Sequence, residues 1–159
     1  MKLLYISTAV LLCLAAFDAH TADTTAPSEP EKPAVADPLA MARVHIQAQQ
    51  WPAAIDELRK VTATASADWN NLMGYAQRKQ AKPDLAAAQR YYDAALRINP
   101  KHLGALEYAG ELALMKGELA VAESHLTALD RACNARCEEF DDLKKAIARY
   151  KANGGRWVP

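Results

Sequence analysis

Apolar and small side chains recur along residues 38–152 at the three- and four-residue spacing that is typical of amphipathic helices. In the last of these segments Phe140, Leu143, Ile147 and Tyr150 fall on one stripe. Acidic residues crowd the start of that segment and basic residues its later turns, which is the order that complements a helix dipole. We therefore predict an all-α fold with seven helices, at 38–49, 52–63, 68–80, 84–98, 102–115, 119–132 and 136–152.

The predicted helices repeat with a fixed step along the chain. Ala54, Ala88 and Ala122 are 34 residues apart, and Trp51 and Leu85 keep the same step. A period of this length with a small residue at one helical position is typical of stacked helical hairpins. One hairpin cannot bury its apolar side alone, so neighbouring hairpins must stack to form a continuous core.

These repeated residues resemble the tetratricopeptide repeat (TPR) family. The third unit carries the pattern most completely, with Gly110 in its first helix, Gly117 at its turn and Ala122 in its second helix. In the second unit the first-helix residues come early, which predicts a lengthened turn at 81–84. The resemblance implies a right-handed superhelix of about three TPR units over 38–134.

Both ends of the chain differ from the repeats. Residues 1–22 have the layout of a signal peptide, in which a basic residue precedes a short apolar run. Residues 23–37 are rich in proline and lack large apolar side chains, so we expect a disordered linker rather than a proline-rich recognition motif. The leader predicts a periplasmic or secreted protein. An uncleaved leader would instead anchor the chain in the inner membrane, and the bulky Leu12 disfavours lipid attachment at Cys13.

The carboxyl-terminal part is predicted to cover the exposed apolar end of the third repeat. Residues 135–152 are expected to form a capping helix, and 153–159 a tail whose Trp157 either folds back on an apolar surface or stays exposed as an anchor for a partner. Cys133 and Cys137 remain after removal of the leader, and an exported protein favours a disulfide between them. Free thiols, a redox pair and metal ligands are the alternatives.

Composition and charge narrow the functional classes. The chain has 159 residues, 51% of them hydrophobic, and its 19 basic and 19 acidic residues give no net charge. This balance argues against nucleic-acid binding. The four histidines are scattered, and the sequence contains neither a phosphate-binding loop nor a nucleophile elbow. We therefore expect no enzyme activity, no cofactor and no metal. The absence of local motifs does not exclude a site that is assembled in space from distant residues.

The resemblance also implies where a partner would bind. TPR arrays hold peptides or protein segments along a concave surface lined by their first helices. The matching positions in this chain are Arg43, Asn71, Tyr75, Arg78, Glu107 and Glu111. Basic residues at one end and acidic residues at the other favour a mixed-charge segment, and the alternative is that these charges are merely solvated. We expect a periplasmic interaction scaffold, with a homodimeric structural component as the second hypothesis.

Overall fold

The computed structural model describes residues 37–62 and 64–158, and this part of the chain forms seven α-helices. Their bounds are α1 Ala40–Gln47, α2 Trp51–Lys60, α3 Ala67–Lys79, α4 Leu85–Ile98, α5 Leu103–Met115, α6 Leu119–Cys133 and α7 Glu138–Ala152. The seven predicted helices are therefore confirmed. The predicted signal peptide at 1–22 and the linker up to residue 36 lie outside the described residues.

Polar side chains fix where three of the helices begin. Ser66, Asp84 and His102 each accept a hydrogen bond from the backbone N–H three residues later, at the starts of α3, α4 and α5. These side chains satisfy backbone donors that have no partner within the helix. The histidine was not predicted as a cap.

The end of α2 differs most from its prediction, because the helix stops at Lys60 rather than at 63. Val61 has an extended backbone with φ −78° and ψ 122°. The indole Nε1 of Trp69 donates to the carbonyl oxygen of Leu58 at 2.8 Å. A continued helix would use that oxygen for its own hydrogen bond, so a tertiary contact replaces the last predicted turn.

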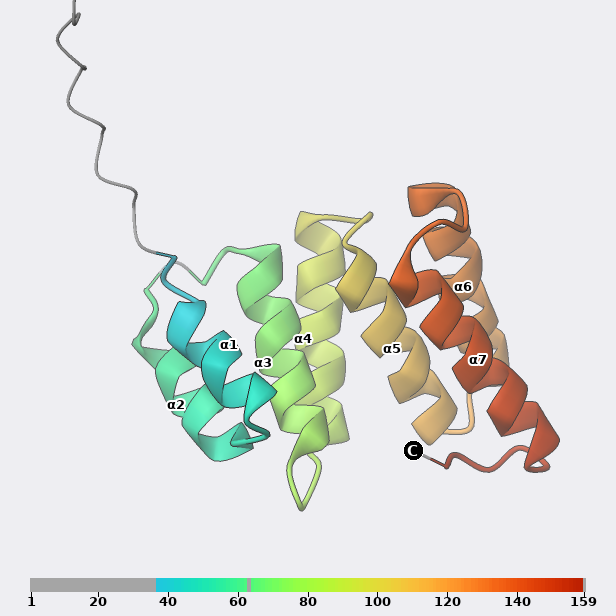
Figure 1. Ribbon diagram of the computed structural model, residues 1–159, viewed down its shortest axis with the longest axis horizontal. Coiled ribbons are helices and arrows are strands. Elements are labelled where there is room, and N and C mark those ends of the chain that lie inside the picture. Colours follow the sequence, from blue (N-terminus) through green and yellow to red (C-terminus); the bar gives the residue numbers. More distant parts are fainter. Residues whose placement is uncertain (1–36, 63, 159) are drawn as a thin grey trace, which may run out of the picture. The chain divides into compact units, whose positions relative to one another are not determined.

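Consecutive helices pack in antiparallel pairs, α1 with α2, α3 with α4 and α5 with α6, and α7 packs on both α5 and α6. The first helix of each pair also contacts the first helix of the next pair. Figure 1 shows α3, α5 and α7 in front of α4 and α6. The connection between α3 and α4 spans 80–84 whereas that between α5 and α6 spans 116–118, so the lengthened turn is confirmed.

Small residues allow the helices to approach closely. Ala54, Ala88 and Ala122 are each fully buried in a second helix. A Cβ atom on Gly74 would lie 2.6 Å from the ring of Tyr92. These small residues therefore lie where two helices meet.

A cysteine pair and an apolar contact of Trp157 hold α7 and the tail on the rest of the domain. Sγ atoms of Cys133 and Cys137 lie at disulfide-bonding distance across the α6–α7 connection, with their Cα atoms 5.9 Å apart. Gly154 and Gly155 have φ values of +66° and +78°, which glycine adopts without strain, and they reverse the chain after α7. Trp157 packs against the apolar cluster around α7, as one of the two predictions for the tail stated. Within 37–62 and 64–158, none of the helices is both long and apolar enough to span a bilayer.

Candidate functional site

The six residues predicted to contact a partner all belong to first helices. We call the surface formed by α1, α3, α5 and α7 the first-helix face. Tyr75 and Arg78 of α3 and Glu107 and Glu111 of α5 form one cluster on it, in which each charge acts on its neighbours. Arg43 belongs instead to a separate network near the start of the helices.

Arg78 is a structural part of this cluster. Its side chain is only 3% exposed, and its Nη2 atom lies 2.6 Å from the Oε2 atom of Glu111. Its guanidinium carbon lies 5.6 Å from the ring centroid of Tyr75 and 5.5 Å from that of Tyr108. A guanidinium held by a carboxylate and two aromatic rings joins α3 firmly to α5. A partner would therefore reach Arg78 only by displacing its neighbours.

Aromatic side chains continue from this cluster across three helices. The ring centroids of Tyr75 and Tyr108 are 4.5 Å apart. Those of Trp51 and Tyr75 are 5.7 Å apart, in an edge-to-face arrangement. Aromatic pairs at such distances stabilise a contact beyond their buried area. The sequence pattern did not single out Tyr108 for this face, and Trp51 reaches Tyr75 from the start of α2. Because α5 is apolar on several sides, its sequence does not show which side meets α3.

The carboxyl group of Glu107 lies half-buried on the first-helix face, beside other carboxylates. Burial raises the pKa of its carboxyl group to about 8, the carboxylates of Glu111, Asp142 and Glu139 add to the rise, and Arg78 opposes it. Asp142 and Glu139 are on α7, so the acidic cluster lies between α5 and α7. Among the described residues, neither Glu107 nor Glu139 forms an ion pair with a basic side chain. Sequence reasoning did not assign the two α7 residues to the face.

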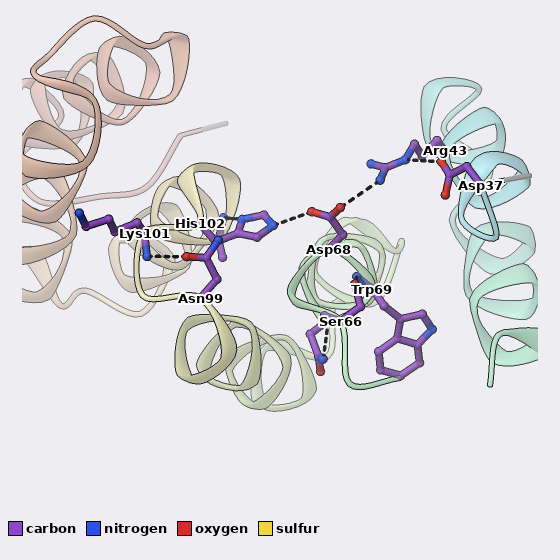
Figure 2. Close-up of polar contacts among 10 residues, drawn as sticks. Asp37, Arg43, Ser66, Asp68, Trp69, Asn99, Lys101 and His102 are labelled. Atoms are coloured by element: carbon purple, nitrogen blue, oxygen red, sulfur yellow. Dashed lines mark hydrogen bonds and ion pairs between the residues drawn. The ribbon is translucent and has the colours of Figure 1, made fainter. Parts of the chain in front are cut away.

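A second polar network crosses the starts of α1, α3 and α5, as Figure 2 shows. Arg43 lies 3.5 Å from carboxylate oxygens of both Asp37 and Asp68. The other carboxylate oxygen of Asp68 lies 2.9 Å from Nε2 of His102. The network therefore connects three consecutive first helices by side chains.

His102 has a different role at each ring nitrogen. Its Nδ1 atom accepts a hydrogen bond from the backbone N–H of Ala105 at 3.1 Å, which caps α5. A neutral ring with its proton on Nε2 then donates to Asp68. Asp68 and His102 are 34 residues apart, so the repeat step is a sequence signal by which this contact could have been found.

Asn71 lies between this network and the aromatic cluster. It is 8% exposed, and its Oδ1 atom has no hydrogen-bond partner among the described residues. Its amide nitrogen would lie 3.1 Å from a Cβ atom on Gly104, so the side chain fills the space that the glycine of α5 leaves. A buried acceptor without a donor carries a desolvation cost that a donor would recover.

A small cavity marks the other end of the cluster. It has a volume of about 190 Å³ and is lined by Arg78, Lys79, Met115 and Trp157. In the residues for which side chains are described, no three or more His, Cys, Asp or Glu side chains are grouped so as to hold a metal ion. The first-helix face therefore combines aromatic rings with both acidic and basic side chains.

Comparisons with known proteins assign no family to this chain. No protein-family model matches the sequence, and no curated protein matches it either. The chain is thus described by its structure as an all-helical domain of seven helices over the described residues, packed in consecutive pairs.

Proposed function

We propose that this chain is an exported interaction scaffold of the TPR type, which acts in the bacterial periplasm by holding a segment of another protein on its first-helix face. It works by shape and charge complementarity on a largely preformed surface and carries out no chemical reaction of its own. The right-handed superhelix of three units is part of this proposal.

Two features of the architecture support the TPR assignment. Adjacent first helices contact one another from α1 to α7, so they present one continuous surface. The alanines at the 34-residue step, Ala54, Ala88 and Ala122, are all fully buried in second helices. Equivalent residues with equivalent burial are expected when each hairpin packs on the next in the same way.

The observation that carries the binding proposal is the incomplete satisfaction of polar groups on the first-helix face. Glu107 is held beside other carboxylates without a basic partner among the described residues, and Asn71 has a buried acceptor without a donor there. Such groups reduce the stability of the isolated fold. A partner that supplies a donor to the half-buried carboxyl group of Glu107 would reduce this cost, which gives binding a physical reason.

Site-specific photocrosslinking in cells tests this proposal. A photoreactive amino acid replaces Gln47 of α1 or Glu139 of α7 on the first-helix face, and Arg90 of α4 or Asp130 of α6 on the second helices. We expect the two face positions to capture the same protein and the two second-helix positions to capture none. Capture from the second helices alone would contradict the proposed face.

Self-association is the second candidate, and the start of the helical array favours it. Met41 and Val44 on α1 are 55% and 52% exposed, whereas the last pair is covered by α7. Two copies that met through α1 would bury these side chains. Sedimentation equilibrium at micromolar concentration separates the candidates, because a monomer excludes the homodimer.

A further inference from the structure

The tail that follows α7 returns to the end of the first-helix face. The chain reverses at 154–155, and Figure 1 shows it running from the end of α7 toward the end of α5. Trp157 then lines the cavity of about 190 Å³ together with Arg78 and Lys79 of α3 and Met115 of α5. A segment of this chain therefore lies where the first helices α3 and α5 end.

The tail is attached through the side chain of Trp157. The indole is partly buried against the apolar cluster of α5, α6 and α7, whereas Arg156 and Val158 are exposed. Backbone hydrogen bonds to the end of α7 stop at Gly155, and among the described residues no hydrogen bond or ion pair joins 156–158 to the helices. A segment with so few contacts opens at a low free-energy cost.

The surroundings of the indole favour an aromatic side chain. Met115 contributes a thioether to the cavity, and contacts of sulfur with aromatic rings are favourable. Lys79 is exposed and forms no ion pair among the described residues, and its Nζ atom lies 5.9 Å from the ring centroid of Tyr75. An ammonium group of this kind also attracts the face of a second ring. An aromatic residue therefore fits this position better than an aliphatic residue does.

Trp157 does not fill the space beside it. The cavity next to the indole measures about 190 Å³, and about 150 Å³ is enough to hold a benzene molecule. Side chains that line unfilled space lack contacts on that side. A segment that carries a second apolar side chain next to its aromatic residue would gain contacts that the tail does not make.

We propose that Trp157 occupies a binding position for an aromatic side chain at the α3–α5 end of the first-helix face, and that the partner inserts such a side chain and displaces the tail. This inference rests on the proposed function and specifies the chemistry of its ligand. The tail is then an internal competitor, and its short link to α7 gives it an effective concentration in the millimolar range. The partner must therefore bind more tightly than a detached copy of the tail.

The test uses the full mature chain, its Trp157→Ala variant and two peptides. One peptide has the sequence of residues 152–159, and the other has alanine at the tryptophan position. Binding is followed by amide chemical-shift changes. Val158→Ala is the matched control, because it shortens an exposed side chain of the same tail. Trp157→Leu keeps an apolar contact with the cluster and replaces Trp157→Ala if that variant loses its helical circular dichroism.

We expect the tail peptide to bind Trp157→Ala and to shift the amide signals of Lys79 and Met115. Its affinity for wild type and for Val158→Ala should be at least about tenfold lower, because the attached tail competes there. The alanine peptide should bind none of the three chains. Equal affinity of wild type and Trp157→Ala for the tail peptide, or no binding to Trp157→Ala, would overturn the inference.

Photocrosslinking in cells separates this inference from the proposed function. Capture at Glu139 should increase in Trp157→Ala, because the internal competitor is absent. If capture is the same in both chains, displacement of the tail is excluded while the proposed function stands, whereas no capture at either face position contradicts the proposed function itself. Sedimentation that shows a wild-type dimer, dissociated by Trp157→Ala, would place the tail on a second copy and overturn the internal contact.

Discussion

The Glu107 carboxyl group lies partly buried on α5, close to three other carboxylates and to one buried guanidinium. Its position could be predicted from the sequence, because the TPR resemblance placed it among the first-helix residues. Its perturbed pKa could not be predicted. That perturbation comes first from burial of the group and then from Glu111, Asp142 and Glu139. The last two belong to α7 and reach the site only through the packing of α7 on α5.

The stability of the protein should depend on the protonation of Glu107. The pKa of the group rises from 4.5 to about 8 on folding, so between these values the folded chain binds more protons than the unfolded chain. Its contribution to stability is therefore lost as the pH rises from about 4.5 to about 8. We expect Glu107→Gln to increase Tm relative to wild type more at about pH 9 than at about pH 5.

Thermal denaturation at both pH values measures this difference, with Asp130→Asn as the control that should show none. Titration of the Glu107 carboxyl carbon by NMR gives its pKa directly. A carboxyl group that titrates near its usual value would contradict the burial described for it.

Close packing at Gly74 gives a second prediction for a single residue. A Cβ atom there would lie 2.6 Å from Cε1 of Tyr92, whose side chain is fully buried. We expect Gly74→Ala to lower the free energy of unfolding by about 1–3 kcal/mol, although alanine favours the helix by about 1 kcal/mol. Urea denaturation measures the loss. Gly104→Ala should cost less, because its nearest neighbour is the amide of Asn71 at 3.1 Å.

The sequence predicted the seven helices of the described residues better than it predicted the contacts between their side chains. The spacing of apolar residues and the 34-residue step predicted every helix in the described part of the chain. The end of α2 could not be predicted, since it depends on the indole of Trp69 from the next helix. The cluster around Arg78 likewise depends on which side of α5 faces α3, and the apolar pattern of α5 leaves that side open.

The contact between α3 and α5 depends on the Arg78–Glu111 pair. Removal of one partner leaves the other charge partly buried, so Arg78→Met should lower the free energy of unfolding by about 3 kcal/mol. The double variant Arg78→Met/Glu111→Leu leaves no unpaired charge, and its loss should be smaller than the sum of the two single losses by about 1–3 kcal/mol. A double-mutant cycle in urea measures this coupling. Additive losses would show that the pair does not join the two helices.

The connection between α6 and α7 depends on the cysteine pair. A bond between Cys133 and Cys137 closes a short loop, so its removal should lower the free energy of unfolding by about 2 kcal/mol. Denaturation of wild type and of Cys133→Ser/Cys137→Ser, both without reductant, measures the difference. Intact mass without reductant checks the premise, because two free thiols in the mature chain would refute the bond.

At the scale of the whole molecule, a net charge of zero conceals an uneven distribution. Internal ion pairs neutralise Arg43 and Arg78 of the first-helix face, and Glu107, Glu139 and Asp142 gather between α5 and α7. The sequence predicted the helices that form this face. It did not predict which of its charges are paired, because ion pairing joins residues that are far apart in the chain.

The central claim is that a segment of another protein binds on the first-helix face. Hydrogen–deuterium exchange of the mature chain, with and without the partner captured by photocrosslinking, tests it most directly. We predict that the partner slows exchange in α3, α5 and α7 and leaves α2, α4 and α6 unchanged. Slowed exchange confined to α2, α4 and α6 would contradict the claim.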